Sequence, residues 1–240
     1  MVQFRSWAES NPGSVRSHNE DNFVDRPDIG LWAVADGAGG HDAGEVASAM
    51  IAETLASIPS GLSASEMLAQ VRLRIAATHQ ALRDEAARRG PRSIIASTLV
   101  VLLARDGHFA CLWAGDSRIY LLRDGQLAQV TRDHSLVQEL VDSGAISPEE
   151  AEGHPRANVI TRAVGADCDP LELEKISGRV QAGDRFLLCS DGLNKTLSDL
   201  ELAGLLGGYD ASSPSLRLIE TALSRHATDN VTAITVEALG

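Results

Sequence analysis

Apolar runs that border an aspartate are the feature that most constrains this chain. There are four: LWAVA precedes Asp36, FACLWAG precedes Asp116, RFLLCS precedes Asp191, and VTAITV follows Asp229 and Asn230. A short apolar run of this kind predicts a buried strand. A carboxylate at the end of a strand is held by the sheet and faces a cleft between loops. We therefore expect several of these acids to converge at one edge of the fold.

Carboxylates that converge in this way repel one another unless cations lie between them. Oxygen ligands suit Mg²⁺ or Mn²⁺, and no HExxH or Cys/His spacing favours zinc. Each aspartate alone is a common turn residue. The segment DGAGGHDAGE, which begins at Asp36, is more specific because glycines let backbone carbonyls approach a metal or ligand closely. Nucleotide binding is a weaker interpretation, since the third glycine of GxGxxG and the P-loop lysine are lacking.

Charge and composition narrow the class of protein. The chain has 33 Asp and Glu against 21 Lys and Arg, a net charge of −12, which argues against binding to nucleic acid or anionic membranes. Its three cysteines show no disulfide or zinc spacing, which predicts a reducing compartment. No secretory signal or membrane anchor is visible, so we expect a cytoplasmic protein.

Two Asp-Gly pairs and four helical patterns predict the fold class. Asp106-Gly107 and Asp124-Gly125 each separate two apolar runs, as in a β-hairpin. The expected strands cover 30–35, 97–105, 108–114, 118–123, 126–131, 185–189 and 231–236. The expected helices cover 43–58, 65–89, 135–143 and 215–225. Hairpins interleaved with long helices indicate an α+β fold of antiparallel sheets covered by helices, in one domain over 1–240.

The ordered motifs of the chain resemble those of the metal-dependent Ser/Thr protein phosphatases, the type 2C-like family, in their bacterial form. The matching segments are GSVRSHNEDN (13–22), DGxGG with GE (36–45), AGDSR (114–118), TxDHS (131–135), NVITRAxG (158–165), SDGL (190–193) and DNVT (229–232). The resemblance covers essentially the whole chain. It implies two antiparallel sheets that form a central sandwich with helices on both faces, a four-layer αββα arrangement, and a mobile flap around 133–162.

The resemblance also implies the ligands of two Mn²⁺ or Mg²⁺ ions. Asp36 would bridge both ions. Asp191 and Asp229 would complete the coordination of the first ion, and Glu20 with the Gly37 carbonyl that of the second.

Further roles follow from the same likeness. A third ion, which bacterial members often bind, would be held by Asp116 together with Asp191. Asp21 would hold a water molecule of the metal centre, Arg16 would grip the substrate phosphate as a bidentate donor, and Asn230 would orient Asp229. Many eukaryotic members place a histidine acid two positions after the bridging aspartate, where this chain has Ala38. His41 is the nearby candidate acid, although a loop role for it is the more common case.

The implied activity is hydrolysis of phosphoserine or phosphothreonine by direct attack of a metal-bridging water, opposing a bacterial Ser/Thr kinase. The partners would be a phosphorylated protein and the cognate kinase pathway, and the chain would act as a monomer. The likeness extends to phosphatases that control type VI secretion through a forkhead-associated protein. Two alternatives stay open: a non-catalytic pseudophosphatase that binds a phosphoprotein, and a phosphatase of anti-sigma antagonists in a partner-switching circuit.

Overall fold

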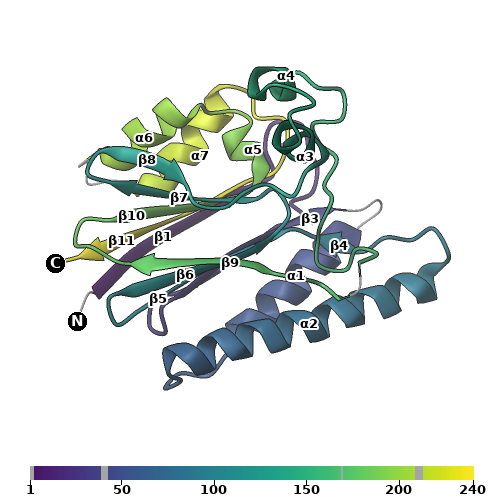
Figure 1. Ribbon diagram of the computed structural model, residues 1–240, viewed down its shortest axis with the longest axis horizontal. Coiled ribbons are helices and arrows are strands. Elements are labelled where there is room, and N and C mark those ends of the chain that lie inside the picture. The colour runs from purple at the N-terminus through teal and green to yellow at the C-terminus, as the bar shows by residue number, and fades with distance from the viewer. Residues whose placement is uncertain (1–2, 39–42, 169, 209–212) are drawn as a thin grey trace.

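The computed structural model describes residues 3–38, 43–168, 170–208 and 213–240, and within them two antiparallel sheets lie face to face (Figure 1). One sheet has five strands in the order β1–β11–β10–β7–β8: β1 (Gln3–Asn11), β11 (Val231–Leu239), β10 (Arg185–Cys189), β7 (Arg118–Arg123) and β8 (Gln126–Gln129). Its long outer strand β1 pairs along its whole length with β11.

The second sheet has six strands, and β3 is its hub. The strands run in the order β2–β3–β5–β6–β9, with β4 also paired to β3: β2 (Asp21–Arg26), β3 (Leu31–Ala38), β4 (Ala96–Ser97), β5 (Leu99–Arg105), β6 (His108–Ala114) and β9 (Glu174–Arg179). All of the strand pairs in both sheets are antiparallel.

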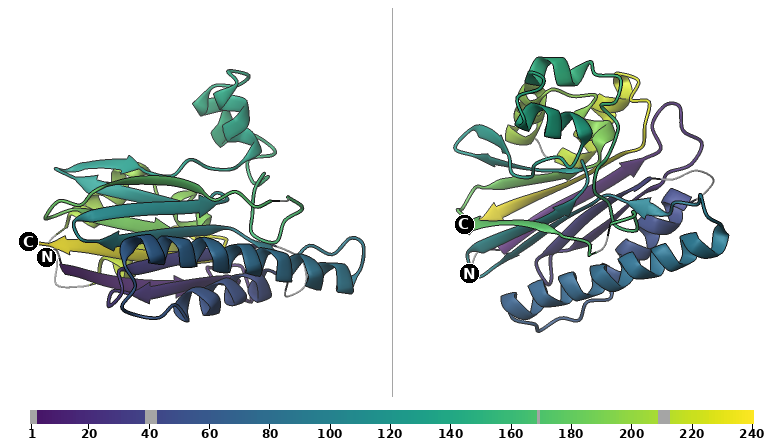
Figure 2. Two further views of the ribbon diagram at one scale, coloured as in Figure 1. Left: turned by 60° about the horizontal axis from the view of Figure 1, so that its bottom comes forward. Right: turned by 45° about the vertical axis from the view of Figure 1, so that its right-hand side comes forward.

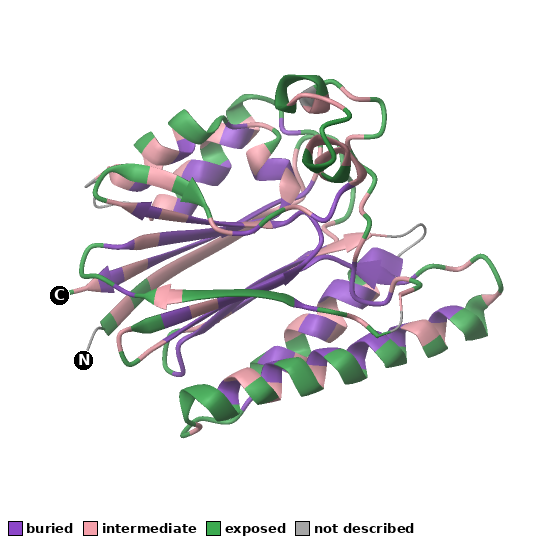
Figure 3. Cartoon of the chain, viewed as in Figure 1, coloured by how far each residue is buried: buried purple, intermediate pink, exposed green. Residues whose placement is uncertain are grey.

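Helices cover the outer face of each sheet, which completes the four layers (Figures 1 and 3). The six-stranded sheet carries α1 (Ala43–Ala56) and α2 (Ala64–Arg89). The five-stranded sheet carries α5 (Asp191–Asn194), α6 (Asp199–Gly207) and α7 (Pro214–Ser224). The expected α+β sandwich with helices on both faces is confirmed. Among the described residues, the longest apolar helical stretch falls short of what a membrane crossing needs.

The period-2 alternation of the strands divides the core into three layers. Trp32 and Val34 of β3 face the other sheet and meet Phe186 and Ile234, whereas Leu31 on the same strand packs against α1 and α2. Strands buried on both faces in this way read as continuous apolar runs, which is why the sequence reveals the central strands so clearly.

The hairpin turns form as the Asp-Gly pairs predict. Asp106 and Gly107 have φ values of 51° and 74°, and Asp124 and Gly125 have φ values of 51° and 77°. Two successive residues with positive φ give the turn a twist that matches the flanking strands, and Asp-Gly tolerates this conformation well. The turns join β5 to β6 and β7 to β8.

Three strands and three short helices lie outside the sequence predictions. The strands are β1, β2 and β9, each at the edge of its sheet, with mixed or exposed side chains. An edge strand with a polar sequence gives little periodic signal, because its pairing rests on backbone hydrogen bonds. The helices are α4 (Pro148–Glu152), α5 and α6, which are too short for periodicity to reveal them.

The segment 133–162 leaves the sandwich and returns to it. It contains α3 (Leu136–Asp142) and α4, and stands apart from the sheets (Figure 2). Its two ends meet: Leu136 donates to the Val159 carbonyl at 2.9 Å, and Thr161 donates to the His134 carbonyl at 2.9 Å. These bonds close the segment at its base, and we keep the name flap for it.

Candidate metal centre

The interior of the sandwich changes from apolar to acidic at one end. Along β3, Trp32 and Val34 face the other sheet, and the next position on the same side is Asp36. Asp36 lies directly opposite Asp21 of β2 in the strand register. Opposed residues of an antiparallel pair point to the same side of the sheet. These two carboxylates therefore form a base for the site between the sheets.

Asp21 is buried, at 5% exposure, and the described residues provide a hydrogen-bond partner for one of its two carboxylate oxygens. Oδ2 accepts hydrogen bonds of 2.7 Å from both Ser190 and Thr232, which lie at the facing end of the five-stranded sheet. Oδ1 has no hydrogen-bond partner among the described residues. Burial, together with the charges of Asp191 and Asp229, raises the pKa of Asp21 to about 7 despite the two hydroxyl donors.

The charges of four other aspartates act on Asp36. Burial and then the charges of Asp21, Asp191, Asp116 and Asp229, in that order, raise its pKa well above the usual range. Its backbone is fixed by the neighbouring strand, since Thr98 Oγ1 accepts from the Asp36 N–H at 3.2 Å and the Thr98 N–H donates to its carbonyl at 2.8 Å. The structure thus brings together the four strand-end aspartates that the sequence singles out.

Two of these aspartates are paired with cations at the rim. Asp191 is the first residue of α5, and its carboxylate forms an ion pair with the Lys195 ammonium one turn later. Asp229 accepts from two nitrogens of Arg16, Nε at 2.9 Å and Nη2 at 3.1 Å. Arg16 is predicted to bind phosphate, but here its guanidinium makes a bidentate contact with the Asp229 carboxylate.

Asp116 follows β6 and closes the site on the side of the flap. It is 5% exposed, and its Oδ1 has no hydrogen-bond partner among the residues described. Burial and the charge of Asp191 raise its pKa to about 7, whereas Lys195 acts in the opposite direction. The preceding Gly115 has a φ of 114°, and a Cβ there would lie 2.6 Å from that of Thr98. Only glycine fits the turn that presents Asp116.

The glycines around Asp36 permit a close approach of backbone segments. A Cβ on Gly37 would lie 2.3 Å from the Gly44 carbonyl oxygen and 2.7 Å from that of Glu20. A Cβ on Gly44 would meet the Glu20 carboxylate at 2.9 Å and the Gly37 carbonyl oxygen at 2.9 Å. The Gly37 carbonyl oxygen and the Glu20 carboxylate therefore both lie beside Gly44, close to each other, as their predicted roles at a shared ion require.

Asn230 ties the N-terminal loop to the site. Its side chain donates to the carbonyls of Pro12 at 3.0 Å and His18 at 2.9 Å, and it accepts from the Glu20 N–H at 2.8 Å. The predicted link to Asp229 runs through the backbone, because the Asn230 N–H donates to Asp229 Oδ1 at 3.0 Å. Asn230 therefore positions Glu20 as well as Asp229.

The donor set fits a hard divalent cation. All of its candidate ligands are oxygens, and two buried carboxylate oxygens, one from Asp21 and one from Asp116, have no hydrogen-bond donor in the described part of the chain. Within those same residues no three acidic, His or Cys side chains already stand in liganding positions. Two of the carboxylates face protein cations instead, Asp191 toward Lys195 and Asp229 toward Arg16.

The segment after Gly37 is described only as far as Ala38. Ala38 is the last residue of β3 and offers no acid at the position where a histidine stands in eukaryotic members. Gly39, Gly40 and His41 lie outside the described residues.

Sequence reasoning missed several residues that shape the site. Lys195 and the hydroxyl pair of Ser190 and Thr232 are among them. Gly13 is another, because its φ is 79° and a Cβ there would lie 2.1 Å from the Asp229 carbonyl oxygen. Ser190, Thr232 and Gly13 all lie inside the motifs quoted above, whereas Lys195 lies just beyond SDGL. The motifs flag the first three positions, but their partners come from other segments.

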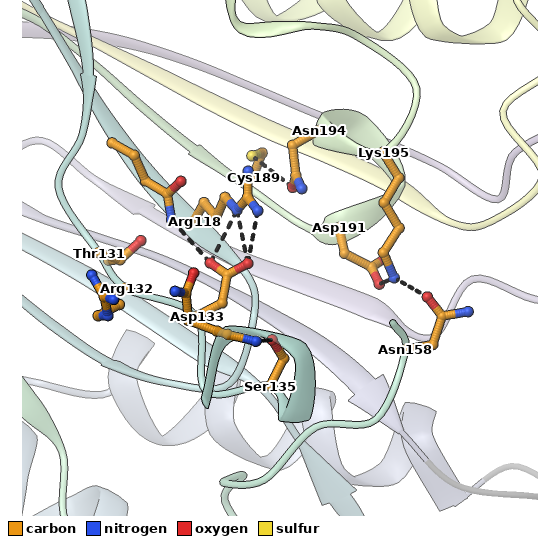
Figure 4. A network of polar contacts seen from close by, with 12 residues as sticks. Arg118, Thr131, Arg132, Asp133, Ser135, Asn158, Cys189, Asp191, Asn194 and Lys195 are labelled. Carbon is orange, nitrogen blue, oxygen red and sulfur yellow. Dashed lines mark hydrogen bonds and ion pairs between the residues drawn. The ribbon is translucent and has the colours of Figure 1, made fainter. Parts of the chain in front are cut away.

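The base of the flap is fastened to the same end of the sandwich (Figure 4). Arg118 donates to both oxygens of Asp133, at 2.7 to 3.1 Å. The Gly115 N–H donates to His134 Nδ1 at 3.1 Å, beside Asp116. A polar cleft of about 450 Å³ opens next to Asp229. It is lined in part by Lys195, which follows α5, and by Asn158, which belongs to the flap.

The model of the family described as "Protein phosphatase 2C" matches residues 14–231, which is most of the chain. This chain belongs to the protein phosphatase 2C family. The resemblance inferred from the ordered motifs is therefore confirmed.

Proteins similar to this chain occur in several bacteria. The chain is 37% identical over 236 residues to the serine/threonine protein phosphatase PstP of Mycobacterium tuberculosis, covering 98% of this chain and 45% of PstP. It is 35% identical to the serine/threonine phosphatase stp of Listeria welshimeri, covering 94% of this chain and 92% of stp. The chain thus spans about half the length of its mycobacterial relative and nearly all of the Listeria protein.

Solved structures agree closely with the fold. PppA of Pseudomonas aeruginosa, described as a key regulatory component of T6SS, superposes with a TM-score of 0.90 at 46% identity over 98% of both chains. The catalytic domain of PstP in complex with two manganese ions gives a TM-score of 0.89 at 36% identity over the full length of both chains.

Proposed function

We propose that this protein is a metal-dependent phosphatase that removes phosphate from phosphoserine and phosphothreonine in proteins. The observation that carries the proposal is the group of four aspartates that raise the pKa of Asp36 at the end of the sandwich. Like charges held this close call for cations, and the donors are all oxygens. Membership of the protein phosphatase 2C family and the two manganese ions in the PstP catalytic domain support the same function.

The residues of the chain divide between holding ions and holding substrate. Asp36, Asp191, Asp229, Glu20 and the Gly37 carbonyl would hold two Mn²⁺ or Mg²⁺ ions. When bound, such ions supply a water of lowered pKa as nucleophile and neutralise charge on the phosphoryl oxygens. No covalent phosphoenzyme is needed, and Cys111 and Cys189 are buried with pKa values raised by burial to about 12, which makes them unsuitable nucleophiles.

Asp21 and Arg16 act on the reacting groups. The Oδ1 of Asp21 has no donor among the described residues, so it would accept a hydrogen bond from a water at the centre and orient it. Arg16 is exposed at the mouth of the site, at 56%, and its fork can exchange Asp229 for two phosphate oxygens. The flap and the cleft beside it would receive the peptide that carries the phosphate.

The substrate class is a phosphorylated bacterial protein, in a circuit that a Ser/Thr kinase opposes. The 46% identity to PppA, described as a key regulatory component of T6SS, supports the secretion-linked form. A forkhead-associated protein as the phosphoprotein is part of the proposal and follows from the resemblance of the motifs alone. We propose a cytoplasmic monomer in which 1–240 form one catalytic domain. The sequence retains Asp36, Asp191 and Asp229, the acids that a pseudophosphatase would be expected to lose, which disfavours that alternative.

Phosphate release from a phosphothreonine peptide tests the function. We expect release with Mn²⁺, none with EDTA, and none from Asp36→Asn in either condition. Asp167→Asn is the matched control, because this carboxylate is fully exposed and pairs with Arg83 away from the centre. Folded, Mn²⁺-bound protein that releases no phosphate from any phosphopeptide would favour the pseudophosphatase. Release from a phosphorylated anti-sigma antagonist alone would favour the partner-switching phosphatase.

A further inference from the structure

Lys195 places a protein cation at the rim of the acidic centre. It caps the C-terminal end of α5, one turn after Asp191. Its ammonium pairs with the Asp191 carboxylate and donates to Asn158 Oδ1 at 2.7 Å (Figure 4). The lysine therefore connects Asp191 to the flap, close to the point where the flap closes on itself.

This ammonium contacts Asp191, one of the two acids expected to hold a third ion. Asp191 and Asp116 act on each other electrostatically, and Lys195 acts on both. Burial lowers the pKa of Lys195, but the charges of Asp191, Asp116 and Asp36 outweigh burial and raise it. The side chain is 41% exposed, so its charged form keeps part of its hydration.

We propose that the Lys195 ammonium compensates part of the charge of the Asp116–Asp191 pair in place of a third divalent cation, so that this chain binds two ions where a relative without the lysine can bind three. The inference rests on the proposed function, since it concerns the ions of that centre. It assigns Lys195 a positioning role: the lysine compensates charge beside the two-ion site and ties the flap to it.

Physical reasons favour the lysine over an ion at this place. The ammonium is tethered to the same chain, so its local concentration is fixed, whereas an ion must be drawn from solution and partly dehydrated. The bond to Asn158 adds a second contact that holds the side chain in position. An ion at the Asp116–Asp191 pair would have to displace the Lys195 amine from Asp191.

Manganese stoichiometry tests the proposal on the full chain. Equilibrium dialysis with metal analysis should give two Mn²⁺ per wild-type chain at saturation and three for Lys195→Met. The dissociation constant of the added ion should be at least roughly tenfold below that of any third ion in the wild type. Lys175→Met is the matched control, because Lys175 is the other lysine of the sequence and is exposed on β9, so two ions are expected.

A double variant locates the added ion. Lys195→Met with Asp116→Asn should return to two ions, because the added site loses a ligand. Lys195→Gln, which retains an amide donor for Asn158, should behave like Lys195→Met and serves if the methionine variant does not fold. Hydrogen exchange of 156–161 should be faster in Lys195→Met than in the wild type, as expected when a tether of the flap is lost.

The outcomes separate the two proposals. Three ions in the wild type, or two in both Lys195 variants, would overturn the role of Lys195 and leave the phosphatase intact. No Mn²⁺ bound by folded wild type would overturn the two-ion centre itself, and with it this inference.

Discussion

The acidic centre has two halves that are built differently. The base, Asp21 and Asp36, lies on paired strands and is held by backbone register and neutral hydroxyl donors. The rim, Asp191 and Asp229, lies at strand ends and is held by the cations of Lys195 and Arg16. At the base, burial and neighbouring acids raise the pKa of both carboxylates, whereas at the rim cationic side chains that can move compensate the charge.

This difference suggests a division of labour. A carboxylate fixed by a sheet is preorganised for a ligand but costs stability while the ligand is absent. A carboxylate paired with a flexible cation costs less, but the cation must leave any carboxylate oxygen that an ion is to take, and Arg16 must leave Asp229 before it can hold a phosphate. If the two halves differ in this way, base and rim should respond differently when one member is changed.

The largest effect is expected from removing one carboxylate of each half. Asp36→Asn and Asp191→Asn should both lower phosphatase activity by at least about 10³-fold, because each loses a metal ligand. Their metal-free stabilities should diverge. Asp36→Asn relieves repulsion among the acids and should melt at a higher temperature in EDTA, whereas Asp191→Asn leaves Lys195 without its carboxylate and should melt no higher than wild type. Equal shifts in the two melting curves would contradict the distinction.

Arg16→Ala tests the exchange of a carboxylate for a phosphate at the rim. The loss of a charge-assisted bidentate contact should raise KM for a phosphopeptide by roughly 10- to 150-fold, about 1.5–3 kcal/mol. Mn²⁺ should bind more tightly to this variant, because Asp229 is released. Arg26→Ala, which removes an equally bidentate but remote pair with Asp28, should leave both values unchanged. An unaltered KM in Arg16→Ala would remove the phosphate role.

A methyl group on Gly37 tests the close approach behind the base. Gly37→Ala would force its Cβ against the carbonyl oxygens of Gly44 and Glu20, and should lower the free energy of unfolding by about 1–3 kcal/mol and weaken Mn²⁺ binding. Gly204→Ala is the matched control, because it lies in α6 with open space around its Cβ. It should stabilise the protein by up to about 1 kcal/mol. Chemical denaturation and metal titration of both variants measure these effects.

The smallest effect is the pH dependence of the metal-free protein. The pKa values of Asp21 and Asp116 are raised by burial to about 7, so the folded state favours their protonated forms. The stability that these groups contribute is complete below about pH 4 and is lost as pH rises to about 7. In EDTA, the melting temperature should therefore fall between pH 5.5 and pH 8, and Asp21→Asn should flatten the slope.

His134 acts in the opposite direction and sets the control for that measurement. Burial lowers the pKa of His134, so its contribution is present above its ordinary pKa and is lost as pH falls. The contribution of the acids is read as the difference between wild type and Asp21→Asn at each pH. An identical slope in the two proteins would show that Asp21 does not titrate in this range.

Sequence patterns predicted the fold where burial is two-sided or turns are tight. The central strands β5, β6, β7 and β10 and the long helix α2 were expected at nearly their observed bounds, because apolar periodicity and Asp-Gly pairs report them directly. The edge strands β1, β2 and β9 escaped prediction. Their pairing depends on which neighbour is available in space, and a polar strand sequence does not encode that choice.

The same division holds for the candidate site. The identities of the acids and their places at strand ends follow from the sequence alone, because an apolar run that stops at an aspartate is a local pattern. Tertiary structure decided what each acid meets: Asp21 faces Asp36 through strand register, and Ser190 and Thr232 reach Asp21 from segments 169 and 211 residues away. The pairing of Asp191 with Lys195 is local, but the bond from that lysine to Asn158 depends on where the flap returns. The sequence alone determines which residue types follow each apolar run. How strongly their charges repel one another, how deeply they are buried and which cations compensate them depend on distances that only the folded chain sets.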